Sequence, residues 1–159
     1  MTLEELEKNV QTLEDINEIE NMHRDFIYWL NNRQSEEWLN EIEFTKAIEY
    51  FTATAVIEMS SYGIHRGKHE VNKLLERLVS EVAFSGGRII VTQPIIEVDG
   101  DKAEGRWVTY RFTEAPTSPP NTKLVLNWEQ GECISGYVKE DGKWKFGSMK
   151  WTYPWPIPD

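Results

Sequence analysis

The sequence predicts an α+β fold: a cone-shaped half-barrel in which a curved antiparallel (mixed) sheet packs on three helices, with an N-terminal helical extension. Up to about residue 85, apolar residues recur at the three- and four-residue spacing of helices. After Gly86 and Gly87 the apolar period changes to two, as in half-buried strands. Two acidic turns that contain glycine, 99–101 and 140–142, then predict hairpins. Helices on one face of such a sheet leave a pocket at its open end.

The first helix is predicted from a capping box and a long apolar stripe. Thr2 and Glu5 have the spacing at which each side chain bonds the backbone N–H of the other. The stripe slips once and comprises Leu3, Leu6, Val10, Leu13, Ile16, Ile19, His23, Phe26 and Leu30. The slip predicts a break near Thr12, so residues 1–12 form a helical extension. The polar segment that starts at Asn31 ends the helix.

Two more helices and one short strand complete the first half. Ser35 is the predicted N-cap of the second helix, whose buried side comprises Trp38, Ile42, Ala47, Ile48 and Phe51. Residues 55–60 form a strand, 62–67 a turn, and 68–84 the third helix. This third helix is expected to bury Val71, Leu74, Leu75, Leu78 and Val82.

The second half is predicted as a meander of four strands. They span 88–98, 103–113, 123–139 and 144–151, with a proline-containing loop at 115–121. Residues 152–159 form a tail rich in proline and tryptophan that cannot be a central strand. The length of 159 residues is that of one domain, so we treat 1–159 as a single unit.

Charge and cysteine content exclude several classes of function. The net charge is −10, and residues 1–50 carry thirteen acids against four bases. Such a chain is not expected to bind nucleic acid or an anionic membrane. A single cysteine, Cys133, excludes an internal disulfide and a cysteine-rich zinc site. With no long apolar span and a polar, acidic start, we expect a soluble cytoplasmic protein.

A series of short segments resembles a known family in order and spacing. They are Phe26–Asn31, Tyr50–Val56, His65–Val71, Val91–Asp101, Gly105–Trp107, Gly136–Tyr137 and Glu140–Trp144. With them the chain resembles the SnoaL-like branch of the nuclear transport factor 2-like superfamily, from about Leu13 to Trp151. Within that branch it is most similar to the bile acid dehydratases and, more distantly, to scytalone dehydratase.

The resemblance implies a cofactor-independent lyase or isomerase acting on an apolar ring compound in an internal cavity. Those dehydratases use no metal and no organic cofactor, and the family commonly forms dimers or trimers, so we expect a homodimer or homotrimer. In them a histidine with a nearby aspartate moves the proton, and tyrosines orient a carbonyl.

This chain departs from the catalytic set of that family. Phe26 stands where the dehydratases have a tyrosine, Asn31 where they have an aspartate, and Thr92 where they have the histidine. Arg111 falls near the position of an acidic residue or histidine in the next strand. Phenylalanine donates no hydrogen bond and asparagine is no carboxylate base. The resemblance therefore carries over the fold but not the catalytic residues.

Two residues are the candidates for chemistry. His23 lies within the apolar stripe of the first helix, where it is either a general base or a hydrogen-bonded core histidine, and the second interpretation is favoured. Arg111 shares a strand phase with Trp107 and Thr109. If that phase faces the cavity, the guanidinium can hold a carboxylate or enolate; otherwise it lies on a solvated face.

The remaining candidates would bind a ligand or shape its cavity. Predicted ligand-binding residues are Phe26, Asn31, Met59, Thr92, Trp107, Thr109, Cys133 and Trp151. His65 and His69 have the spacing of a helical metal pair, but Gly67 between them favours a loop and N-cap, so we expect no metal. Three hypotheses stay open: a dehydratase-like lyase or isomerase, a non-catalytic binder of a small apolar ring-type molecule, and a structural domain whose cavity is filled by its own side chains.

Overall fold

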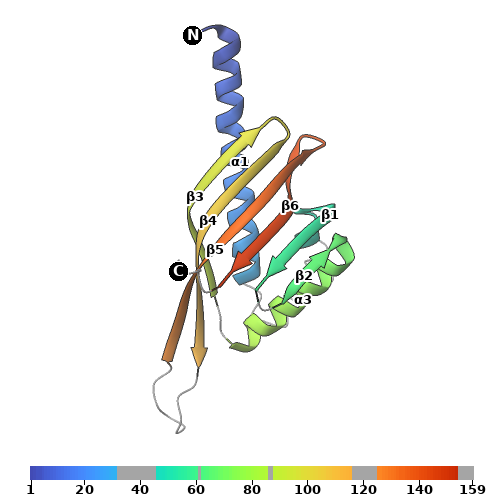
Figure 1. Ribbon diagram of the computed structural model, residues 1–159, viewed down its shortest axis with the longest axis vertical. Helices are drawn as coiled ribbons and strands as arrows, with labels where there is room; N and C mark the ends of the chain where they lie inside the picture. Colours follow the sequence, from blue (N-terminus) through green and yellow to red (C-terminus); the bar gives the residue numbers. More distant parts are fainter. Residues whose placement is uncertain (32–45, 61, 86–87, 116–124, 154–159) are drawn as a thin grey trace, which may run out of the picture.

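The computed structural model describes residues 1–31, 46–60, 62–85, 88–115 and 125–153 (Figure 1). Two helices and six strands lie in these ranges: α1 Leu3–Asn31, β1 Phe51–Met59, β2 Gly63–Arg66, α3 Gly67–Ser85, β3 Arg88–Asp99, β4 Lys102–Ala115, β5 Val125–Glu140 and β6 Lys143–Thr152. Residues 46–48 are also helical and fall within the second predicted helix, most of which lies outside the described ranges. No helix in the described ranges is long and apolar enough to span a membrane.

The six strands form one mixed sheet in the order β2-β1-β6-β5-β4-β3. The β1–β6 pair is parallel and every other pair is antiparallel. Positive φ angles at Gly100, Asp141 and Gly142 allow the two tight turns of the meander. The predicted α+β half-barrel is therefore confirmed, including the antiparallel meander of its second half.

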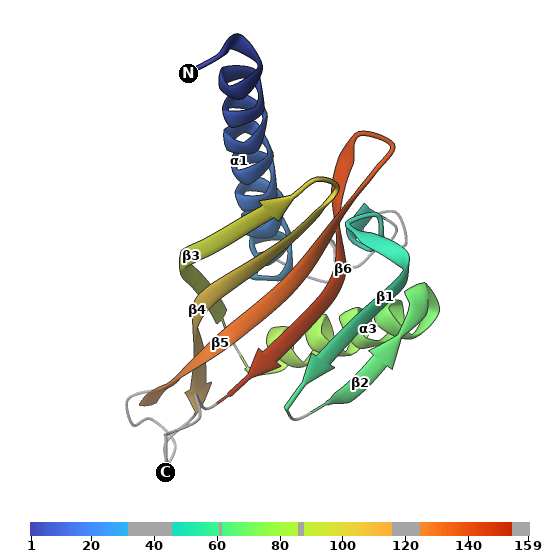
Figure 2. The ribbon, with the colours of Figure 1, turned by 45° about the horizontal axis from the view of Figure 1, so that its top comes forward.

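One face of the sheet, the inner face, packs against α1 and α3 (Figure 2). On β4 the odd positions are buried: Trp107 is 2% exposed and Thr109 0%, whereas Arg106 points to solvent. Trp107 lies opposite Cys133 of β5, which in turn lies opposite Trp151 of β6. The sequence did not determine which face of the sheet Trp107, Thr109 and Arg111 occupy. In the structure this strand phase belongs to the inner face.

Three predicted boundaries were wrong. Helix α1 continues through Thr12 without a break. Its first turns are exposed, so no packing partner among the described residues requires the apolar stripe to stay in phase. β1 begins at Phe51 rather than at residue 55, so Phe51 belongs to a strand and not to the second helix. Residues 63–66, predicted as a turn, form edge strand β2, because β1 supplies its hydrogen-bonding partner.

The contacts of α1 with the sheet begin near Asp15. Asp15 is 5% exposed, and its carboxylate accepts hydrogen bonds from the Trp144 indole (3.0 Å), the Lys139 ammonium (3.0 Å) and the Gln11 amide (3.2 Å). Burial raises the pKa of Asp15, but these three hydrogen bonds lower it more, so the pKa lies below its ordinary value. Asp15 therefore anchors α1 to the β5–β6 hairpin.

Asp15→Ala is expected to lower the free energy of unfolding by about 1–3 kcal/mol, because the buried indole N–H of Trp144 loses its acceptor. Urea unfolding at pH 7 measures the loss, with exposed Glu14→Ala as the control. Because the folded pKa is depressed, the contribution of Asp15 is present above the ordinary carboxyl pKa and lost as pH falls through the folded pKa. Equal losses in both variants would contradict the anchoring role.

Candidate functional site

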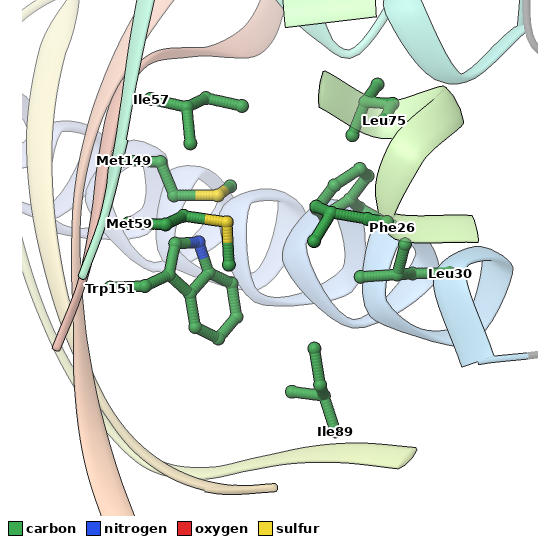
Figure 3. Close-up of a pocket in the computed structure, with 9 residues that line it drawn as sticks. Phe26, Leu30, Ile57, Met59, Leu75, Ile89, Met149 and Trp151 are labelled. Atoms are coloured by element: carbon green, nitrogen blue, oxygen red, sulfur yellow. The ribbon is translucent and has the colours of Figure 1, made fainter. Parts of the chain in front are cut away.

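An apolar pocket lies between α1, α3 and the inner face of the sheet (Figure 3). Met59, Met149 and Trp151 project into it from the sheet, toward Phe26 and Leu75 on the helices. Its lining consists of Phe26, Leu30, Ile57, Met59, Leu75, Leu78, Ile89, Met149 and Trp151. None of these nine side chains is ionisable. The lining of the pocket is therefore entirely apolar.

The pocket contains little free space. Its cavity volume is about 10 Å³, the space of roughly one water molecule. A ring compound would have to displace side chains. Met59 and Met149 make that feasible, because methionine is flexible and adapts to irregular shapes.

His23 lies in the core outside this lining, within a buried hydrogen-bonded group. The Trp107 indole donates to the Tyr137 hydroxyl at 2.9 Å, and that hydroxyl lies 2.7 Å from Nδ1 of His23. The Tyr137 proton is then available for Nδ1, which assigns the ring proton to Nε2. The imidazole also stacks on Trp107 with ring centroids 4.2 Å apart.

The environment keeps His23 neutral. Its side chain is fully buried, and burial lowers its pKa to about 3. Nε2 has no hydrogen-bond partner among the described residues. Burial also raises the pKa of Tyr137, so neither group is charged near neutral pH. The pair can offer a buried N–H donor, but its histidine is a weak base.

Arg111 lies at a second, smaller pocket. This pocket is lined by Met59, Ser60, Tyr62, Arg111, Trp151 and Tyr153, so Met59 and Trp151 form a wall common to both pockets. The guanidinium forms an ion pair with Glu129, its cross-strand neighbour, and lies 5.1 Å from the ring centre of Tyr153. Glu129 thereby neutralises the charge that could hold an anionic ligand.

Asn31 binds the backbone of edge strand β3. Its amide nitrogen donates to the carbonyl of Ile89 at 2.7 Å, and its oxygen accepts from the N–H of Ile89 at 2.9 Å. The two hydrogen bonds pair backbone N–H and C=O groups that an edge strand otherwise leaves without a partner in the sheet. Asn31 thus joins the end of α1 to the residue that closes one side of the apolar pocket.

Asn31→Asp is expected to lower the free energy of unfolding by about 1–3 kcal/mol. The substitution replaces the donor that faces the Ile89 carbonyl with an acceptor, and it adds a negative charge at a helix C-terminus. Chemical denaturation compares it with Asn17→Asp on the exposed side of the same helix. Wild-type stability in Asn31→Asp would show that the bidentate contact is dispensable.

The other predicted ligand-binding residues divide into three groups. Phe26, Met59 and Trp151 line the apolar pocket. Trp107, Thr109 and Cys133 are buried on the inner face but do not line it. Thr92 pairs with Val108 in the outward strand phase, so the register does not bring it to the pocket. Burial raises the pKa of Cys133 to about 12, so its thiol is not activated.

The sequence did not single out Leu30, Ile57, Leu75, Leu78, Ile89 or Met149 as lining residues. Their apolar periodicity placed most of them in the core, but a core residue and a pocket residue give the same pattern. Of the two histidines proposed and rejected as a metal pair, His65 has its Nε2 2.9 Å from the carbonyl oxygen of Tyr62, and His69 is exposed on α3.

Comparisons with known proteins agree on the family and the fold. Residues 11–150 match the model of the SnoaL-like domain. An NTF2-like protein with a cystatin-like fold from Novosphingobium aromaticivorans superposes with a TM-score of 0.72 at 12% identity, covering 94% of this chain and 88% of the other. A putative scytalone dehydratase from the same organism gives 0.67 at 18%, covering 92% and 91%.

A hexachlorocyclohexane dehydrochlorinase, LinA type 2, gives a TM-score of 0.67 at 16% identity, covering 91% of this chain and 88% of the other. No curated protein matches the sequence. At these identities the structural relatives show that the fold is shared.

Proposed function

Because this chain belongs to the SnoaL-like domain family, we propose that it binds one small apolar ring-type molecule in the pocket between α1, α3 and the sheet. The observation that carries this proposal is the lining of nine uncharged side chains. A charged or strongly polar guest would lose its hydration there without gaining partners. The indole of Trp151 provides a flat wall for a ring.

Binding is tested with native mass spectrometry of freshly purified protein and with thermal shifts against paired probes. We expect naphthalene to raise the melting temperature and naphthalene sulfonate to leave it unchanged, because the sulfonate cannot be solvated in an apolar lining. Failure of every neutral ring compound in a panel of steroids, polyketides and aromatic hydrocarbons would count against the proposal.

A matched pair of variants locates the bound probe. Leu78→Phe adds atoms inside the lining, whereas Leu74→Phe adds the same atoms four residues earlier on α3, outside it. We expect the thermal shift to disappear only in Leu78→Phe. A shift retained in both variants would place the probe elsewhere.

A dehydratase-like lyase or isomerase is the second candidate, favoured by the buried Nε2 of His23, which has no hydrogen-bond partner in the part of the chain that the structure describes. The putative scytalone dehydratase and the dehydrochlorinase share the fold. In this candidate function the neutral His23 donates a hydrogen bond from Nε2 to the leaving hydroxyl oxygen, Arg111 holds a second oxygen, and the proton lost from carbon leaves with that hydroxyl as water. A ligand identified by the binding experiment should then lose water, and His23→Ala should abolish turnover while binding is retained.

A further inference from the structure

The N-terminal part of α1 projects beyond the sheet (Figure 1), and an apolar stripe on it is exposed. This α1 stripe consists of Leu3, Leu6, Val10 and Leu13, which are 71%, 49%, 46% and 66% exposed. Four large apolar side chains on one helix face form a contiguous patch rather than scattered surface residues. Within the described residues, the first contact that ties α1 to the sheet is at Asp15, two residues beyond the stripe.

A second apolar surface lies on the outer face of the sheet, opposite the helices. This outer sheet patch consists of Ile90, Ile95, Tyr110, Phe112 and Trp128. Cross-strand pairing places Ile90 beside Tyr110 and Phe112 beside Trp128, and the rings of Tyr110 and Trp128 are 6.0 Å apart. Ile90, Ile95 and Trp128 are 48%, 63% and 60% exposed.

We propose that the α1 stripe of one copy of this chain docks on the outer sheet patch of a second copy, and that the second copy returns the same contact. A molecule cannot make this contact with itself, because α1 packs on the inner face and the patch lies on the outer face (Figure 2). A two-fold axis closes the pair, since each copy supplies one stripe and one patch.

The areas favour this arrangement over a helix pair. Side chains about half to two-thirds exposed each offer on the order of 100 Å². Two reciprocal stripe-to-patch contacts then bury roughly 1,400 Å², within the usual range of stable interfaces. Pairing two α1 stripes with each other buries only roughly 800 Å², the size of a weak contact.

The charges favour the same arrangement. Exposed Glu7 and Glu14 border the α1 stripe. Arg106 borders the outer sheet patch opposite Ile95 in the strand register, with its Nε 3.9 Å from Glu104. Two stripes side by side bring acids near acids, whereas the patch face carries both signs of charge.

Cross-linking of full-length single-cysteine variants tests which surfaces meet. Val10→Cys and Ile90→Cys proteins are mixed, allowed to exchange subunits, and treated with a short bis-maleimide; native Cys133 is fully buried. We expect a dimeric mass in light scattering and a cross-link between the two different variants. A cross-link of Val10→Cys only with itself would indicate a helix pair, and one of Ile90→Cys only with itself a sheet-to-sheet contact; either overturns the proposal.

Charge substitutions give an independent test. Leu6→Glu with Val10→Glu is expected to shift the dimer to monomer, while the melting of the domain persists because the stripe precedes the anchoring contact at Asp15. Lys8→Glu changes the net charge by the same two units on the opposite side of the same exposed segment and should leave the dimer intact. A wild-type monomer at tens of micromolar, or a dimer unaffected by the double substitution, would overturn the proposal.

Discussion

The protein is expected to lose stability steadily as pH falls from about 6.5 toward 3, because folding buries His23 in its neutral form. Burial lowers the pKa of this imidazole to about 3, whereas an unfolded chain protonates it near its ordinary value of 6.5. Between these values the unfolded state binds one more proton than the folded state, so acid favours unfolding. The loss is about 1.4 kcal/mol per pH unit.

This loss reaches roughly 4 kcal/mol by pH 3.5, a large share of the stability of a typical domain. His23→Gln should flatten the dependence, because the amide does not titrate and its oxygen can still accept from Tyr137. His69→Gln, on the exposed side of α3, should leave it unchanged. Urea unfolding at pH 7, 6, 5 and 4 measures all three proteins, and parallel slopes in wild type and His23→Gln would refute the prediction.

Acid also removes the contribution of Asp15, but in a different range. That carboxylate has a depressed pKa, so its share of the stability is lost only below its ordinary value of 3.8. The decline between pH 6.5 and about 4 therefore reports His23.

Leu75→Ala is expected to lower the free energy of unfolding by about 2–5 kcal/mol and to enlarge the apolar pocket. The side chain is fully buried and forms part of the lining, so its removal costs both transfer free energy and the new cavity. The wild-type pocket has room for about one water. The variant should therefore bind a larger ring compound than wild type does, and that ligand should recover part of the lost stability.

Val71→Ala is the matched control for this experiment. Val71 is fully buried on the same helix and does not line the pocket. It should lose stability without gaining ligand-dependent recovery. Thermal melting of both variants with and without naphthalene or a larger polycyclic compound distinguishes them. Equal ligand-dependent recovery of stability in both variants would show that the ligand binds outside the pocket described above.

Local patterns in the sequence determined most of the fold. The switch of apolar period from helical spacing to two at Gly86 and Gly87, together with the turns at 99–101 and 140–142, predicted the meander β3 to β6. Those signals are local, since they depend on backbone conformation and on which side of one element is apolar. The sequence did not predict edge strand β2, because four residues are too few to show a clear apolar period. The strand forms by pairing with β1.

The site was decided by tertiary structure. An apolar side chain in the core and one in a pocket wall look alike in a sequence, so Ile57, Leu75 and Met149 could not be distinguished from other core residues. The strand phase that brings Trp107 inward and Thr92 outward is fixed by register with neighbouring strands. The position of Asn31 in the chain predicted a ligand-binding residue. In the structure its side chain instead binds the backbone of Ile89, 58 residues further along the chain.

The stripe of α1 shows the same division. Its spacing predicted an apolar stripe from Leu3 to Leu30 that slips once, with a break near Thr12, whereas the helix runs through that slip without a break. Only the tertiary structure shows that the sheet covers it from Ile19 onward and leaves Leu3 to Leu13 exposed. The sequence shows which residues are apolar, whereas the tertiary structure determines which of them are buried. Burial depends on elements that lie far apart in the sequence.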